Sequence, residues 1–544
     1  MEEYQFRPTT TQGAAMTVEK NVAIPMRDGT PLLGDVFRPQ DDGPAPVIMT
    51  LGPYGKDVHF ADFNRGVYDQ VDQHGEFANF ETVNPEYWVP HRYAVIRLDQ
   101  RGTGRSPGRM DLFGPQQSED FYDAVEWAAE QPWCSGRVGL LGISYYAISQ
   151  WQVAALQPPH LSAIVPWEGV SDLYREWSHH GGIFSNGFTE MWWDRQIGLN
   201  QHRGVGSRVH ENGLVDENVD LRAEHAAHPL FDDFHAARIV DFGKITVPLL
   251  SVGNWGGHGL HLRGNIEGYL AAASTDKRLA VHSGSHFAPF YTEHGYAMQR
   301  KFLDYWLHDI DTGLLAEPPI QLAIRDSADQ LTWRGEHEWP LARTQWTPLH
   351  LDASAGTLRT AAPETSCTAS FTADGPGLVL YSAPFEAETE ITGPLSLSIW
   401  IDSTTTDADL FVQLLNIDPG GQTLTFTDAA GGQNPSVTLG WLRASHRELD
   451  DQRSIEWRPY HTHTRTEPLV PGEPTRLDIE IWPTSMVFPA GQRLGLVIAG
   501  HDTPGLTAFR HNHPADRDRP ELHGVTTIHT GPEHPSRLLL PVIP

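Results

Sequence analysis

A serine lies in a strand–turn–helix context in the first half of the chain. The segment Gly142-Ile143-Ser144-Tyr145-Tyr146-Ala147 ends the apolar run 137–143 and precedes the helix-like segment 149–156. In a nucleophile elbow, a strained turn exposes a serine hydroxyl above a sheet, and small flanking residues relieve crowding. The motif departs from strict G-x-S-x-G at its last position, where Ala147 replaces glycine. The pattern favours a nucleophilic Ser144, with a purely structural turn as the alternative.

Strands and helices alternate through this half of the chain. Short apolar or β-branched runs predict buried strands at 46–52, 93–99, 137–143, 161–167, 247–253 and 277–284. A helix is predicted over 118–131, and Asp28-Gly29 predicts a hairpin turn. Such alternation is typical of a mostly parallel sheet covered on both faces. A Trp- and His-rich insertion at 171–240 interrupts it, and we expect this insertion over the carboxyl edge of the sheet, where ligands bind.

Period-two alternation replaces the helical pattern after about residue 330. The segments 395–401, 476–482 and 493–500 each place apolar residues on one face, with turn clusters such as 418–421 and 471–475 between them. This pattern is typical of an all-β sandwich or jelly roll.

Taken in order, these motifs resemble the cocaine-esterase-like serine hydrolases, a group that also holds X-Pro dipeptidyl peptidases and α-amino-acid ester hydrolases. The resemblance spans about residues 20–540 and rests on Pro53-Tyr54-Gly55-Lys56, the D-x-R-G-x-G-x-S stretch at 99–106, Trp127 with 131–134, the Ser144 turn, and the segments 392–394, 406–409 and 418–421. It implies an α/β chain with an α/β-hydrolase core in residues 1–170 and 241–330, a helical cap at 171–240 and a C-terminal β jelly roll at 331–544.

A serine hydroxyl becomes a good nucleophile only when a base takes its proton. In this fold the order along the chain is serine, acid, histidine, and the histidine follows the last core strand. His286 follows the run 277–284, whereas His282 should still lie within that strand, so His286 is the predicted base. For the oxyanion we expect the amide of Tyr145 and, by resemblance, the hydroxyl of Tyr54.

The triad acid departs from the family pattern. The family places an aspartate just after the strand 247–253, but the sequence there has Gly256-Gly257. Some hydrolases of this fold carry the acid after the neighbouring strand instead, which is Glu168 in this chain. Glu168 is therefore the predicted acid, while Glu267 or no acid at all stays open.

Three histidine pairs are candidate metal ligands, but their spacing does not support a metal site. His258 with His261, and the pairs 461/463 and 511/513, lack the partner spacing of a zinc enzyme. Their loop contexts predict solvated side chains instead. We therefore assign no metal and no cofactor.

The predicted substrate is a small ester or amide. Aromatic residues crowd the insertion, and we expect Trp177, Trp192 and Trp255 to contact the substrate, because such pockets are largely apolar. An X-Pro peptidase or amino-ester hydrolase must also bind an amine, for which the insertion offers Glu176, Glu190 and Asp194. Those two activities remain alternatives, as does a degenerate hydrolase fold that serves as a binding protein.

The charge balance excludes some partners. The 544 residues include 69 Asp+Glu and 39 Lys+Arg, a net charge of −30, which argues against nucleic acid or an anionic membrane as partner. No apolar run approaches a transmembrane length, the N-terminus shows no secretory signal, and two cysteines make no disulfide framework. These features predict a cytoplasmic protein, and whether it forms a homo-oligomer stays open.

Overall fold

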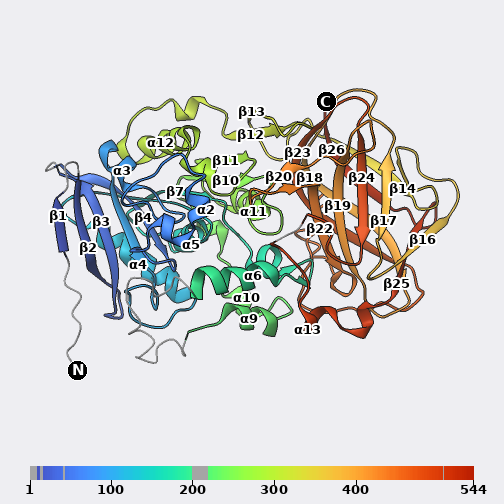
Figure 1. Cartoon of the computed structure of the whole chain (residues 1–544), viewed down its shortest axis with the longest axis horizontal. Coiled ribbons are helices and arrows are strands. Elements are labelled where there is room, and N and C mark those ends of the chain that lie inside the picture. Colours follow the sequence, from blue (N-terminus) through green and yellow to red (C-terminus); the bar gives the residue numbers. More distant parts are fainter. Residues whose placement is uncertain (1–8, 13–15, 41–42, 199–217, 506–507) are drawn as a thin grey trace.

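The computed structural model describes residues 9–12, 16–40, 43–198, 218–505 and 508–544. Two large sheets dominate it, one in each half of the chain (Figure 1). Residues 1–8, at the predicted signal-free N-terminus, and residues 199–217 of the predicted insertion lie outside the described residues.

The first sheet runs in the order β1-β2-β3-β5-β4-β6-β7-β10-β11-β12-β13, and its central strands are parallel. The predicted hairpin at Asp28-Gly29 joins β2 and β3, which pair in antiparallel fashion. The six strands predicted as buried runs are confirmed as β4, β5, β6, β7, β10 and β11. The strands of this sheet are β1 (Thr9–Gln12), β2 (Met16–Pro25), β3 (Pro31–Pro39), β4 (Ala45–Gly52), β5 (Ala94–Asp99), β6 (Cys134–Ile143), β7 (Leu161–Trp167), β10 (Leu249–Asn254), β11 (Lys277–His282), β12 (Ile320–Arg325) and β13 (Leu331–Glu336).

Helices cover both faces of this sheet. α12 packs into one apolar cluster, whereas α4 and α11 pack into a second cluster. The central parallel strands β4 and β5 are buried along their whole length, because side chains on both faces meet a helix layer. The predicted helix 118–131 is confirmed as α4. The helices of this half are α1 (Phe60–Phe63), α2 (Arg65–Tyr68), α3 (Pro85–Trp88), α4 (Pro115–Ala129), α5 (Tyr145–Ala154), α11 (Leu262–Ala271) and α12 (Glu293–His308).

The C-terminal half is a separate all-β domain. Its sheet runs in the order β16-β25-β18-β23-β22-β19-β24-β17-β15-β14-β26, and β26 also pairs with β18, so the sheet curls back on itself. Alternate residues of β18 and β23, including Leu397, Ile399 and Ile479, fill its core as the alternation predicted. The elements are β14 (Gln345–Asp352), β15 (Thr357–Arg359), β16 (Cys367–Thr372), β17 (Leu378–Ser382), β18 (Thr389–Ser403), β19 (Asp409–Ile417), β22 (Ser436–Arg443), β23 (Thr475–Phe488), β24 (Arg493–Ala499), β25 (Val525–Thr530), β26 (Arg537–Ile543), the short hairpin of β20 (Phe426–Thr427) and β21 (Gln433–Asn434), and the helix α13 (Pro514–Arg517).

The insertion after β7 lies between the two sheets (Figure 1). Its described part mixes short helices with a two-stranded ribbon, so it is less regular than the predicted helical cap. Its elements are a π-helical turn (Tyr174–Ser178), β8 (His179–His180), β9 (Ile183–Phe184), α6 (Gly187–Trp192), a second π-helical turn (Trp193–Ile197), α9 (Leu221–Ala227) and α10 (Asp233–Ala236).

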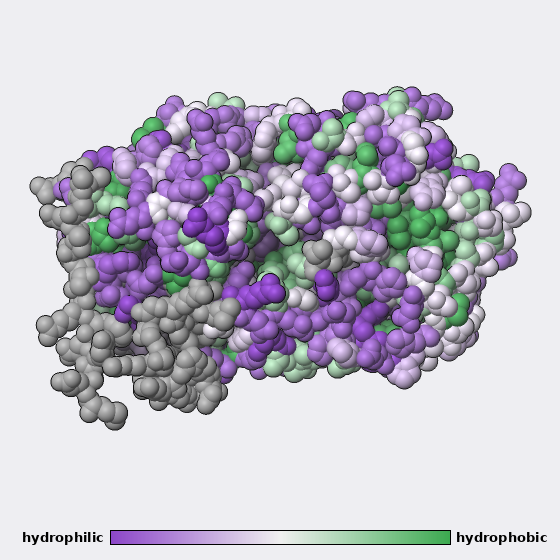
Figure 2. Space-filling model, viewed as in Figure 1, coloured by the Kyte–Doolittle hydropathy of each residue, from purple (hydrophilic) through white to green (hydrophobic). Residues whose placement is uncertain are grey.

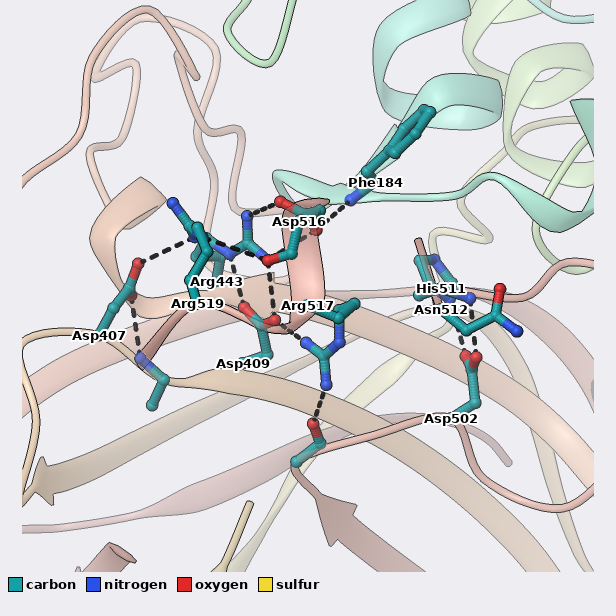
Figure 3. A network of polar contacts seen from close by, with 12 residues as sticks. Phe184, Asp407, Asp409, Arg443, Asp502, His511, Asn512, Asp516, Arg517 and Arg519 are labelled. Atoms are coloured by element: carbon teal, nitrogen blue, oxygen red, sulfur yellow. Dashed lines mark hydrogen bonds and ion pairs between the residues drawn. The ribbon is translucent and has the colours of Figure 1, made fainter. Parts of the chain in front are cut away.

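Backbone hydrogen bonds attach this insertion to an ion-pair network of the β domain (Figure 3). Arg443 of β22 donates to Asp409 at 2.7 Å and to Asp516 at 2.6 Å, and Asp516 accepts from the backbone N–H of Phe184 in β9. Arg517 pairs with the same Asp409. The backbone N–H of Arg443 also donates to Gly181 O at 2.9 Å. The β domain therefore fixes the position of the ribbon.

The visible face of the molecule is mostly hydrophilic (Figure 2). Apolar residues gather on this face over the β domain (Figure 2). Among the described residues, no helix has the length and hydropathy needed to cross a membrane.

Candidate active site

Ser144 lies on the sharp turn between β6 and α5. Its φ of 57° falls in the left-handed region, which a residue with a side chain adopts at a cost of about 1–3 kcal/mol. The turn is held because Ser144 N–H donates to Trp167 O at 3.0 Å, while Ser144 O accepts the amides of Ala147 and Ile148. The methyl of Ala147 fits because Gly169 opposite it has no side chain. The strand–turn–helix predicted around Ser144 is therefore present despite the alanine.

The sheet order brings the other polar groups to the same edge. Strands β6, β7, β10 and β11 are neighbours and run parallel, so their carboxyl ends meet. Glu168 directly follows β7, Asn254 ends β10, His282 ends β11, and His286 lies in the loop after β11. His282 is thus within its strand, as predicted.

Glu168 holds the ring of His286. Its Oε2 lies 2.7 Å from His286 Nδ1, while its Oε1 lies 3.0 Å from His282 Nε2. Asn254 Nδ2 donates to the same carboxylate at 3.3 Å and to Gly284 O at 2.7 Å. Glu168 is fully buried and has a φ of 50°, so a strained backbone aims the carboxylate at the ring.

The charges of this pair stabilise each other. Burial alone would raise the pKa of Glu168, but the His286 charge and hydrogen bonds from both histidines outweigh it and lower that pKa to about 2. Burial likewise opposes a charged His286, yet Glu168, with a smaller effect of Glu81, raises the pKa of His286 to about 10. The arrangement therefore favours an imidazolium, which is the species that a base forms when it accepts a serine proton.

His261 is the direct hydrogen-bond partner of Ser144. Its Nε2 lies 3.3 Å from Ser144 Oγ, and its ring stacks on that of His286 with centroids 4.9 Å apart and planes 10° from parallel. Among the described residues, Ser144 Oγ makes no hydrogen bond to His286. Burial, and then the charge of His286, lower the pKa of His261 to about 3, so this ring stays neutral.

Tyr54 lies on the cap side of the nucleophile. Its hydroxyl accepts from Trp192 Nε1 at 2.9 Å, and its ring packs edge-to-face on Tyr145, with centroids 6.0 Å apart. Burial, and then the charge of Glu81, raise the pKa of Tyr54 well above its ordinary value, so its hydroxyl keeps its proton. Tyr145 opens α5, and the first amides of a helix have no partner within the helix. The candidate donors are thus the N–H of Tyr145, which follows Ser144 directly, and the O–H of Tyr54, whose ring packs on Tyr145.

The chain as a whole superposes on a protein of known structure. A CocE/NonD family hydrolase from Staphylococcus aureus superposes with a TM-score of 0.90 and 32% identity, over 97% of this chain and 94% of that one. The chain belongs to the CocE/NonD hydrolase family. Residues 28–288 match the family described as X-Pro dipeptidyl-peptidase (S15 family), and residues 312–539 match the X-Pro dipeptidyl-peptidase C-terminal non-catalytic domain.

Other relatives agree with this family. The cocaine esterase of Rhodococcus sp. (strain MB1 Bresler) is 26% identical over 97% of this chain and 99% of its own length. An α-amino acid ester hydrolase shares the fold, with a TM-score of 0.74 and 17% identity over 99% of both chains. The family resemblance predicted from the sequence is confirmed, and the chain is a serine hydrolase.

In this CocE/NonD hydrolase, a hairpin of the β domain packs against the glycines at the expected acid position. A Cβ on Gly256 would lie 3.0 Å from Asp428 Cα, and the next residue, Ala429, accepts the backbone N–H of His286 at 2.9 Å. The turn between β20 and β21 therefore holds both the glycine loop and the His286 loop. The alternative acid, Glu267, lies elsewhere and pairs with Arg458 at 2.7 Å.

The three predicted substrate-contacting tryptophans have different surroundings. Trp192 bonds to Tyr54 and packs on Trp177, whose Nε1 donates to Thr189 at 2.8 Å. Trp255 is fully buried, and its Nε1 donates to Ala323 O at 2.8 Å. It belongs to a different apolar cluster from the one that contains Tyr145, Trp177 and Trp192. The structure therefore brings Trp177 and Trp192 close to Tyr54 but places Trp255 in the core.

Sequence reasoning misjudged His258 and His261 and missed Asn254 and Glu81 in this CocE/NonD site. His258 and His261 are 3% exposed, so the prediction of solvated side chains is wrong. Asn254 and Glu81 carry no motif that would single them out. Only the position of His261, in the loop where the family keeps its acid, offered a signal. Within the described residues, no three His, Cys, Asp or Glu side chains converge as metal ligands.

Proposed function

We propose that this hydrolase cleaves a small carboxylic ester or amide through an acyl-enzyme on Ser144, with His286 as base and Glu168 as the triad acid. The supporting observation is the 2.7 Å contact between Glu168 and His286 Nδ1 at the edge of the sheet that also carries the Ser144 turn. A carboxylate in this place fixes the ring orientation and stabilises the imidazolium.

The reaction has two halves. Ser144 Oγ attacks the carbonyl carbon while its proton passes to His286 Nε2, and the imidazolium then protonates the leaving group. Water attacks the acyl-enzyme in the second half, with His286 again taking and returning the proton. Tyr54 and the Tyr145 amide donate to the oxyanion, where preorganised donors are worth about 3–4 kcal/mol each.

His286 is a better base than His261, although His261 is closer to Ser144 in the free enzyme. Its partner Glu168 stabilises the charged ring, whereas His261 Nδ1 has no hydrogen-bond partner among the described residues. With its pKa lowered to about 3 by burial and by His286, His261 cannot hold the serine proton. The serine hydroxyl must turn from His261 to the adjacent parallel ring, and catalytic contacts often tighten in this way only when substrate binds.

Glu176 and Asp194, two of the three acids that the insertion offers for an amine, already have partners within the chain. Glu176 accepts from Ser171 N–H at 2.7 Å and from Arg263 Nη1 at 2.8 Å. Asp194 pairs with Arg222 at 2.6 Å. Because internal donors already engage these carboxylates, a plain ester or amide is the favoured substrate over an X-Pro peptide or an amino-acid ester. For the β domain we propose a jelly roll, in keeping with its curled sheet.

Turnover of p-nitrophenyl acetate and butyrate tests this function. Ser144→Ala should abolish hydrolysis and labelling by a fluorophosphonate, because only an activated serine reacts with this reagent. His286→Ala should lower kcat/KM by about 10³-fold or more, and His261→Ala by about 10-fold. Full turnover by Ser144→Ala would refute the scheme, and an equal loss in the two histidine variants would make His261 part of the base. A wild-type enzyme that is inert to both reagents would support the binding-protein alternative.

A further inference from the structure

Glu81 is a buried carboxylate in the active site that the proposed mechanism leaves without a role. It belongs to the segment between α2 and α3, and its backbone carbonyl accepts the amide of Ile143, the residue before the nucleophile. The neighbouring Thr82 forms a β-bridge to Gly142. Glu81 is 3% exposed and has a φ of 60°. A strained backbone therefore holds this side chain beside the Ser144 turn, as it does for Glu168.

The carboxylate faces the side of His286 that must receive the serine proton. Glu81 Oε1 lies 3.4 Å from His286 Nε2, and Glu81 Oε2 has no hydrogen-bond partner among the described residues. Burial raises the pKa of Glu81 to about 7, although the contact with His286 opposes the rise. A buried carboxylate with an unsatisfied oxygen is costly, so its presence calls for a function.

His286 therefore has a carboxylate at each ring nitrogen. Two ionised acceptors require a proton on both nitrogens, and a ring in that state has no lone pair for the Ser144 proton. The remaining titratable groups around the pair come from several elements: His261 stacks on His286, His282 contacts Glu168, and, besides burial, the charge of Glu81 helps to raise the pKa values of Tyr54, Tyr146 and Tyr291. Of these groups, only Glu81 lies at Nε2.

We propose that Glu81 is a positioning residue for the catalytic base. Glu81 holds the Nε2 edge of His286 in the free enzyme and accepts the Nε2 proton as substrate binds. The inference rests on the proposed roles of Ser144 and His286. The Nε2–H bond breaks, an O–H bond forms on Glu81 Oε1, and the electron pair stays on Nε2. That lone pair then accepts the Ser144 proton as Oγ bonds to the carbonyl carbon, and Glu81 returns its proton after product leaves.

Substrate binding supplies the driving force for this transfer. A bound acyl group covers the part of the His286 side chain that is still exposed, and this loss of water favours two neutral groups over the charged pair. The transfer converts an ion pair into two neutral groups, so it needs no other reactant. Neutral Glu81 no longer holds Nε2 by charge, and Ser144 can then replace it as the partner of the ring.

The pH dependence of Glu81→Gln tests the proposal. An ionised Glu81 favours the protonated, inactive ring, so its removal should lower the pKa of His286. The acidic limb of kcat/KM should move to lower pH by about one unit or more, and the rate of fluorophosphonate labelling should move with it. Glu267→Gln is the control, because it also removes one carboxylate, which pairs with Arg458 and not with His286. This variant should leave the acidic limb of kcat/KM at its wild-type pH.

A second variant guards against misfolding. Asn tolerates the left-handed backbone of residue 81, so Glu81→Asn should fold and show the same shift. Folded variants whose acidic limb is unmoved, or whose labelling is lost at every pH, would overturn the role of Glu81. Failure of the proposed function looks different, because wild-type enzyme would then keep its turnover after Ser144→Ala.

Discussion

Replacement of Glu168 by glutamine is the sharpest perturbation of the proposed triad. Glu168→Gln keeps the size of the side chain but removes the charge that lies 2.7 Å from His286 Nδ1. The pKa of His286, raised to about 10 from 6.5 against the effect of burial, corresponds to about 5 kcal/mol of preference for the imidazolium. Glu168 supplies the larger part of that preference, and Glu81 supplies the rest.

The charge of Glu168 also stabilises the transition state, in which His286 carries the serine proton. We therefore expect Glu168→Gln to lower kcat/KM for p-nitrophenyl butyrate by about 10³–10⁴-fold, with KM changed little. The loss should also have a pH signature. Because the raised pKa of His286 falls when Glu168 is neutralised, the residual activity should extend to lower pH than in the wild type.

Three controls make the result interpretable. Glu267→Gln, which alters the other candidate acid, should change kcat/KM less than about twofold, because its ion pair with Arg458 is partly exposed. Circular dichroism and the melting temperature report whether Glu168→Gln still folds. A folded Glu168→Gln enzyme that keeps more than a tenth of wild-type kcat/KM would refute Glu168 as the triad acid.

Two further outcomes follow from other contacts. Tyr54→Phe removes the oxyanion O–H but keeps the buried ring, so kcat should fall by about 10²-fold at an unchanged KM in steady-state assays; a fall below threefold would remove Tyr54 from the oxyanion hole. Asp409→Asn leaves the buried Arg443 guanidinium undercompensated, so denaturant titration should show a loss of about 3–5 kcal/mol in unfolding free energy. An Asp478→Asn control, at an exposed pair with Arg476, should cost less than about 1 kcal/mol, and an equal loss in the two variants would contradict the role of burial.

The β domain contributes to the active site through backbone contacts. The turn after β20 fills the space beside Gly256 and binds the His286 amide, so the glycines that replace the family's acid also make room for this turn. The loop after β10 therefore packs against the hairpin, while the proposed acid, Glu168, follows β7.

Local sequence was sufficient for the features that depend on neighbours in the chain. The turn at Ser144 was predictable because a strand, a tight turn and a helix follow one another within about twenty residues. The place of His286, in the loop after a core strand, was predictable because it follows the last long apolar run of the first half. Alternation in 395–401 and 476–482 likewise marked the β domain, since side-chain period is a local property of a strand.

Tertiary structure decided everything that depends on which strands become neighbours. Glu168 contacts His286 because β7, β10 and β11 are neighbours in the sheet and all three end at one edge. This strand order cannot be read from the order of the strands along the chain. Glu81 and His261 come from loops without motifs, and their proximity to Ser144 and His286 arises only when those loops pack over that edge. A carboxylate acts on a ring across a few ångströms of space, and among 69 acidic residues only the fold determines which ones lie within that distance.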